Sequence, residues 1–314
     1  MSDKLNDMQR YLLEEEVENL KQRRIGRREF AQRVGLMVGA SATAGLLLSI
    51  GCNENNNEEP AAGGADMAAA PDLASVADRV AEDDPAIRAG AVQIADNGFK
   101  LTGYRATPAV VPAGAAALLV IHENRALTPY IQDVVRRWGK AGYVALCVDM
   151  LSRVGGSAAF PDESTRPAAL GQIPQDQSLA DLAAGLDYLK AQANVNAARL
   201  GVTGFCFGGG YTWRLATLRA DVKAAVAFYG PSPPLADVPK IKAAVLGIYG
   251  ALDTRITGAV GDLETALKSA SITYELKIYD GADHAFHNDT GTRYEAAAAR
   301  DAWQRASAWF AKYV

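Results

Sequence analysis

Cysteine and histidine are scarce in this chain, which has three of each among 314 residues. The cysteines, Cys52, Cys147 and Cys206, are too few and too scattered for a disulfide framework, and they lack the paired spacing of a zinc site. The sequence therefore predicts no metal and no cofactor. Each cysteine needs its own explanation, and Cys147, inside the apolar run YVALCVDM, is most simply a small buried core residue.

An excess of either charge is also missing. Lys and Arg number 32 against 36 Asp and Glu, for a net charge of -4. This balance does not provide the basic surface that nucleic-acid binding requires, so no nucleic-acid partner is predicted. With 49% hydrophobic and 22% charged residues, the composition is that of an ordinary globular protein.

A strongly hydrophobic run is missing as well. The most apolar segment near the N-terminus, VGLMVGASATAGLLLSIG, is rich in Gly, Ala and Ser, which argues against a permanent membrane span. A polar, helix-prone stretch of residues 1–32 comes before it and ends in QRRIGRREFAQR. Arg27 and Arg28, followed by Glu29 and Phe30, resemble the twin-arginine export signal. We therefore expect the twin-arginine machinery to export the chain to the periplasm or to the outer side of the membrane.

The apolar segment ends at Gly51 and Cys52, as in the cleavage site of bacterial lipoproteins, although Ser49 stands where such sites usually carry Leu. Residues 1–52 are thus predicted to be a signal segment with lipid attached at Cys52, and an uncleaved anchor is the alternative. Residues 53–88 lack aromatics and are rich in Asn, Glu, Ala, Gly and Pro, which is typical of a flexible tether. A tether here would hold a folded domain away from a lipid surface.

Residues 89–314 alternate between strand and helix patterns. A β-hairpin is predicted around the Asp-Asn-Gly turn in VQIADNGFKLTGYRATP, and apolar strands then alternate with helices to the C-terminus. This rhythm predicts one α/β domain with a mostly parallel sheet and helices on both faces. Ligands bind such sheets at the carboxyl ends of the strands.

Three strand ends carry reactive side chains: Cys206 after RLGVTGF, Asp253 after IYGAL, and His284 in YDGADHAF. Their order is that of α/β hydrolases, whose nucleophile lies on a strained bend with a glycine two residues to each side. Gly204 and Gly208 occupy those positions. Three alternatives stay open: a chance glycine-rich turn at Cys206, an ordinary turn residue at Asp253, and a supporting or surface role for the nearby His287.

In this arrangement Asp253 orients His284, His284 moves the proton, and Cys206 attacks a carbonyl carbon. The following helix and the histidine are expected to favour the reactive thiolate. The Phe207 amide is expected to face the developing oxyanion. Glu123, directly after the apolar strand AALLVIHE, is expected to accept a hydrogen bond from the thiol, with a solvated loop acid as the alternative.

The segments IHENRALTPYIQDVVRRWGKAGYVALCVDML, GFCFGGG, GALDTRI and GADHAFHND together resemble the dienelactone hydrolase family. The resemblance implies the α/β hydrolase fold and hydrolysis of an enol lactone through an acyl-cysteine. It implies that Cys206, Asp253 and His284 form the catalytic triad, that Glu123 contacts the resting thiol, and that the Asn124 amide is a second oxyanion donor.

The substrate site departs from the family pattern. An arginine that grips the substrate carboxylate is expected four residues after the histidine, where this chain has Asn288. Arg153 and Arg166 are both candidates for a second such arginine, and Arg125 is a further possible anion contact. The sequence thus predicts a hydrolase of activated esters or lactones. The alternative is a non-catalytic exported lipoprotein that binds a ligand on the same scaffold; a serine esterase is excluded because no serine stands at the bend.

Overall fold

The computed structural model describes residues 5–38, 79–96 and 98–314. The predicted lipid attachment site at Cys52 and residues 53–78 of the predicted tether lie outside the described residues. Among the helices that are described, none combines the length and the apolar character needed to cross a bilayer.

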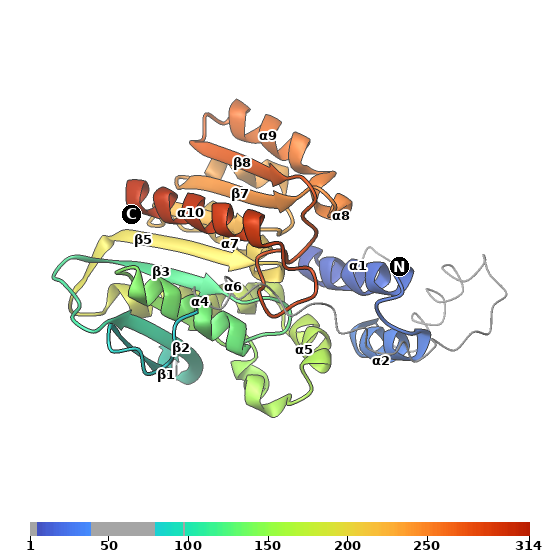
Figure 1. The fold of residues 1–314 in the computed structure, drawn as a ribbon, viewed down its shortest axis with the longest axis horizontal. Coiled ribbons are helices and arrows are strands. Elements are labelled where there is room, and N and C mark those ends of the chain that lie inside the picture. The colour runs from blue at the N-terminus through green and yellow to red at the C-terminus, as the bar shows by residue number, and fades with distance from the viewer. Residues whose placement is uncertain (1–4, 39–78, 97) are drawn as a thin grey trace.

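The centre of the fold is an eight-stranded sheet with the order β1-β2-β4-β3-β5-β6-β7-β8 (Figure 1). Strands β3 to β8 run parallel to one another, and β1 and β2 form an antiparallel edge. The strands are β1 (Ile87–Asp96), β2 (Phe99–Pro108), β3 (Ala115–Ile121), β4 (Val144–Val148), β5 (Val195–Phe205), β6 (Ala224–Phe228), β7 (Ala244–Gly250) and β8 (Tyr274–Tyr279). The predicted mostly parallel α/β sheet is confirmed.

The predicted hairpin is present. Asp96, the last residue of β1, pairs with Phe99, the first residue of β2, in antiparallel register. Contacts with the folded part begin ahead of β1, because the Val80 amide donates to Asp133 Oδ1 at 2.8 Å and the Val80 carbonyl accepts from Arg136. The last residues of the predicted tether therefore pack against the domain that was expected to begin at residue 89.

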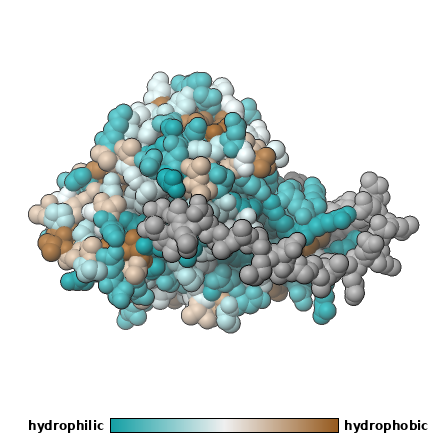
Figure 2. All heavy atoms as spheres, viewed as in Figure 1, coloured by the Kyte–Doolittle hydropathy of each residue, from teal (hydrophilic) through white to brown (hydrophobic). Residues whose placement is uncertain are grey.

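Helices cover both faces of the sheet, with α4 and α10 in front and α6 and α7 behind in Figure 1. Every residue of β3, β4, β6 and β7 is buried, as expected for strands covered on both sides. The helices of this part are α4 (Pro129–Lys140), α5 (Arg166–Gln172), α6 (Gln175–Lys190), α7 (Phe207–Leu218), α8 (Thr254–Thr257), α9 (Val260–Ser269) and α10 (Ala296–Tyr313). On the face shown in Figure 2, hydrophobic side chains are few and scattered.

Two N-terminal helices, α1 (Asp7–Lys21) and α2 (Arg27–Val38), pack beside the carboxyl ends of the parallel strands (Figure 1). Helix α1 begins with a capping box, in which the Asn6 and Gln9 side chains each accept from the other residue's backbone amide. Ile25, Phe30 and Val34 form a small apolar cluster with the partly buried apolar side chains of α1. Helix α1 also contacts α5 and α7, and α2 contacts α5, so the predicted signal segment is folded against the α/β domain over its described residues.

Candidate active site

Cys206 lies on a sharp bend between the end of β5 and the start of α7. Its backbone has φ 58° and ψ −119°, a conformation that a residue with a side chain rarely adopts. Two hydrogen bonds hold the bend: the Cys206 amide donates to the Phe228 carbonyl at 3.0 Å, and the Cys206 carbonyl accepts from the Gly209 amide at 2.9 Å. The bend lifts the thiol out of the strand at the carboxyl edge of the sheet.

The two glycines around the bend leave no room for a side chain. A Cβ atom on Gly204 would lie 2.2 Å from the Gly208 carbonyl oxygen, and one on Gly208 would lie 2.4 Å from the Ile121 carbonyl oxygen. Both obstacles are backbone atoms, which cannot rotate away. The spacing found in the sequence is therefore a requirement of close packing between the bend and β3.

Asp253 and His284 follow β7 and β8, and they form a buried pair. His284 Nδ1 and Asp253 Oδ2 are 2.6 Å apart. Burial acts to raise the pKa of Asp253, but the charge of His284 and its hydrogen bond outweigh burial and hold that pKa below its usual value. The pair fixes the ring, and a ring nitrogen of His284 lies within 4.8 Å of the Cys206 sulfur.

Glu123 does not make the expected contact with the thiol. Its carboxylate accepts hydrogen bonds from the Tyr229 hydroxyl at 3.3 Å and from the Asn288 amide at 2.8 Å. Asn288 stands at the position where the family pattern has an arginine, and its hydrogen bond fixes the position of the Glu123 carboxylate. Glu123 is buried rather than a solvated loop acid, and burial raises its pKa.

Of the two expected oxyanion donors, the structure places one against the sulfur. The Asn124 backbone amide faces the Cys206 thiol, and Phe207 is the first residue of α7, so its amide has no partner within the helix. His122 holds the preceding backbone, because Nδ1 bonds to the Glu123 carbonyl at 2.7 Å and Nε2 accepts from the Met150 amide at 3.1 Å. Both predicted amides therefore lie on backbone that the fold holds in place.

The expectation of a thiolate was wrong for this state of the molecule. Burial raises the pKa of Cys206 well above its usual value, and the carboxylates of Glu15 and Glu123 raise it further. The hydrogen bond with Tyr11 and the Asn124 amide act in the opposite direction and are outweighed. Burial first, and then the two carboxylates, thus favour the neutral thiol over the thiolate.

Two of these neighbours, Tyr11 and Glu15, come from α1. The Tyr11 hydroxyl is 3.1 Å from the Cys206 sulfur and 3.3 Å from His284 Nε2. Glu15 Oε2 accepts from the Asn124 side chain at 2.9 Å and lies 3.7 Å from the same sulfur. Sequence reasoning missed both residues, although the spacing of Met8, Tyr11 and Leu12 was a signal of a helix with one buried face.

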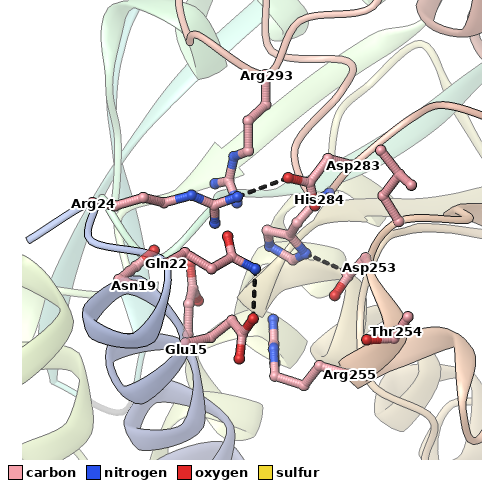
Figure 3. A pocket seen from close by; sticks show the side chains of 12 residues that line it. Glu15, Asn19, Gln22, Arg24, Asp253, Thr254, Arg255, Asp283, His284 and Arg293 are labelled. Atoms are coloured by element: carbon pink, nitrogen blue, oxygen red, sulfur yellow. Dashed lines mark hydrogen bonds and ion pairs between the residues drawn. The ribbon is translucent and has the colours of Figure 1, made fainter. Parts of the chain in front are cut away.

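The arginines considered as substrate contacts have different environments. Arg153 pairs with Asp96 and Asp181, and Arg166 donates to the Phe160 and Arg125 carbonyls, so both support local structure. The charge of Arg125 lies near Glu16 of α1. Two arginines that the sequence did not single out lie closer to the reactive pair: Arg255 and Arg293, which point toward the pocket beside His284 together with Arg24 (Figure 3).

Cys206, His284 and Glu15 place three atoms that are able to bind a metal within 4.8 Å of one another. The Tyr11 hydroxyl already bonds to both the sulfur and the imidazole nitrogen. The trio is therefore engaged by a protein group, and we assign no metal to it.

The sequence model of the Dienelactone hydrolase family matches residues 101–314. This chain belongs to the dienelactone hydrolase family. A Salmonella typhimurium protein with a provisional carboxymethylenebutenolidase name is 35% identical over 245 residues, which are 73% of this chain and 89% of that protein. A Saccharolobus solfataricus protein with the same provisional name is 30% identical and covers 67% of this chain and 93% of its own length.

Solved structures agree with this assignment. A Klebsiella pneumoniae protein described provisionally as a dienelactone hydrolase aligns with a TM-score of 0.68 and 34% identity, over 73% of this chain and all of that chain. The Pyrococcus horikoshii acylaminoacyl peptidase, at 14% identity and a TM-score of 0.61, shows a likeness of fold alone. The chain is a carboxymethylenebutenolidase-like hydrolase with an α/β hydrolase fold. Helices α1 and α2 lie outside the residues that the family model matches.

His287 has a structural environment. Its Nδ1 is 2.7 Å from the Tyr130 hydroxyl, and its ring packs against Phe205, Phe228 and Trp303. Burial, together with the positive charge of Arg137, lowers the pKa of His287 to about 3. The ring therefore stays neutral in the folded protein at every pH above that value.

We expect Gly204→Ala to lower the free energy of unfolding by about 3 kcal/mol or more, because the added methyl group collides with backbone. Gly261→Ala is the matched control: a Cβ there meets nothing within 4 Å, and we expect it to be neutral or to stabilise by up to about 1 kcal/mol. Urea denaturation followed by circular dichroism measures both. Equal stability of the two variants would contradict the packing argument.

We expect His287 to make the protein sensitive to acid. The unfolded chain binds a proton at this side chain below a pH of about 6.5, whereas the folded protein does not until a pH of about 3. Stability should thus fall with decreasing pH in this window by on the order of 1.4 kcal/mol per unit from this group. In His287→Asn that contribution is absent, so the stability difference from the wild type should shrink between pH 7 and pH 4. A difference that stays constant over this range would disprove the assignment.

Proposed function

We propose that this hydrolase cleaves an activated ester or a lactone through an acyl-cysteine intermediate, with Cys206 as nucleophile, His284 as base and Asp253 as its partner. The observation that supports this most is the thiol at the strained bend, within 4.8 Å of an imidazole nitrogen whose ring is fixed by a buried carboxylate. A strained bend is maintained only where the surrounding structure enforces it, and such positions concentrate at reactive sites.

In the proposed reaction, His284 Nε2 takes the thiol proton while the sulfur bonds to the carbonyl carbon. The oxyanion that forms accepts hydrogen bonds from the Phe207 and Asn124 amides. The C–O bond to the leaving oxygen then breaks, and His284 returns the proton to that oxygen. A water molecule next attacks the thioester with His284 as base, which releases the acid and restores the thiol.

The chemistry of a cysteine nucleophile favours activated substrates. A thiolate leaves the tetrahedral intermediate more easily than an alkoxide, so an ordinary ester would return to the starting state. An enol or aryl ester releases a more stable oxyanion, which favours the forward direction. Arg255 and Arg293 add positive charge beside His284, which suits a substrate with an anionic group.

The non-catalytic alternative has one observation in its favour. With α1 in place, the space left beside Glu15, Asp253 and His284 is about 20 Å³. A cavity of that size holds about one water molecule, so no ester fits. Turnover therefore requires α1 to move, and an assay of function has to include a variant in which the helix is displaced.

We expect a p-nitrophenyl ester to acylate Cys206 and to be turned over by a Met8→Asp/Leu12→Asp variant, whose two buried charges should displace α1. Adding Cys206→Ala to this variant should lower turnover by at least about a thousandfold, and adding Cys147→Ala should leave turnover unchanged. Mass spectrometry of trapped peptides locates the acyl group. Full activity of the variant that lacks Cys206 would exclude Cys206 as the nucleophile, and no turnover by the Met8→Asp/Leu12→Asp variant would favour the non-catalytic alternative.

We also propose export by the twin-arginine machinery, with attachment of lipid at Cys52. Arg27 and Arg28 are exposed at the start of α2, where a partner has access to them. Replacing both by Lys should leave the precursor in the cytoplasm, whereas the same change at the exposed Arg88 should not affect export. Cell fractionation and immunoblotting measure this. Unchanged export of the variant that lacks the pair would exclude the twin-arginine route.

A further inference from the structure

We propose that α1 is a tethered inhibitor, and that the catalytic crevice is a binding site for an acidic helix that presents a tyrosine to the nucleophile. This inference rests on the proposed function of the crevice. Its basis is the set of contacts that α1 makes with Cys206 and His284. A helix that only stabilised the fold would not need to contact these reactive groups.

The Tyr11 hydroxyl occupies the place of a reacting oxygen. In the proposed reaction the leaving oxygen must lie near both the sulfur and His284 Nε2, because the bond to it breaks as the proton arrives. The phenol lies 3.1 Å and 3.3 Å from these two atoms. The Arg255 guanidinium lies 4.6 Å from the centre of the Tyr11 ring, which adds a cation–π contact. Tyr11 thus binds as the phenol product of an aryl ester would.

Glu15 blocks the neighbouring positions and changes the charge of the site. It takes the hydrogen bond of the Asn124 side chain and lies 3.7 Å from the sulfur. Its carboxylate also contributes to the raised pKa of Cys206. The helix therefore fills the space a substrate needs and, by its own charge and by burial, keeps the nucleophile protonated.

The surface under α1 is shaped to receive it. The buried face of the helix consists of Met8, Tyr11, Leu12, Glu15 and Glu16. Met8 packs against Gly210 of α7: a Cβ atom added to Gly210 would lie 3.0 Å from the methyl group of Met8. Gln9 Nε2 donates to the Gly171 carbonyl of α5 at 2.8 Å.

Ion pairs fix both ends of the same segment. Asp7 pairs with Arg214 of α7 at the start of the helix. Arg24, just after the helix, pairs with Asp283 at 2.7 Å, directly beside His284. Arg27 and Arg28 remain exposed while the helix is docked, and the predicted processing at Cys52 would remove α1 together with the signal.

The test measures how fast iodoacetamide alkylates Cys206 in the full chain at pH 7, with peptide mapping to separate the three cysteines. The Met8→Asp/Leu12→Asp variant should react at least about tenfold faster than the wild type, because the reactive state of the wild type is limited to its undocked fraction. Leu36→Asp is the control: Leu36 is 63% exposed on α2, so the same change there should leave the rate unchanged. Circular dichroism establishes that each variant is folded.

A synthetic peptide of residues 5–24 supplies the second arm. Added to the Met8→Asp/Leu12→Asp variant, it should slow alkylation of Cys206, and a peptide with Tyr11→Ala should be at least about tenfold weaker. Wild-type labelling as fast as in that variant, or a peptide without effect, would overturn the inhibitor proposal. Fast labelling of the variant without any ester turnover would support the inhibitor and refute the proposed function, so the two failures are distinguishable.

Discussion

The backbone bend at Cys206 is the constraint on which the rest of the site depends. At φ 58° the chain turns from β5 into α7 so tightly that its neighbours must lack side chains, since Gly204 nearly touches the bend's own backbone and Gly208 lies against the end of β3. The sheet order β3-β5-β6 places this bend between two strands whose carbonyl groups close around it. Those contacts place the thiol at the carboxyl edge of the sheet.

Electrostatics then decide the state of that thiol. The sulfur is buried among the carboxylates of Glu15 and Glu123, and a charge of the same sign close by in a low-dielectric interior opposes formation of the thiolate. One of the two carboxylates belongs to the fixed catalytic part, where Asn288 and Tyr229 hold it. The other arrives with α1, so the docking of one helix changes both the shape and the reactivity of the site.

The proposed export signal and the proposed inhibitor helix both lie in the N-terminal segment. Its arginine pair is exposed at the start of α2, while the helix before it fills the crevice of a hydrolase whose family match begins at residue 101. If the proposed export signal and the proposed inhibitor helix both operate, one segment would couple the location of the protein to its activity. The docked helix is held by contacts of three kinds: one apolar face, a phenol, and an ion pair near each end.

The sequence by itself determined the sheet, the bend and the reactive pair, because each depends on local patterns: apolar strands alternating with helices, glycines flanking Cys206, and strand ends carrying Asp253 and His284. It did not determine the partner of Glu123, the protonation of the thiol, or the roles of Arg153, Arg166 and Arg255. Those depend on which side chains meet across distant segments, as Tyr11 meets Cys206 across 195 residues. Only the tertiary structure determines such contacts. The burial of an atom and the electrostatic field at it depend on every group packed around it, and the order of residues in the chain does not show which groups those are.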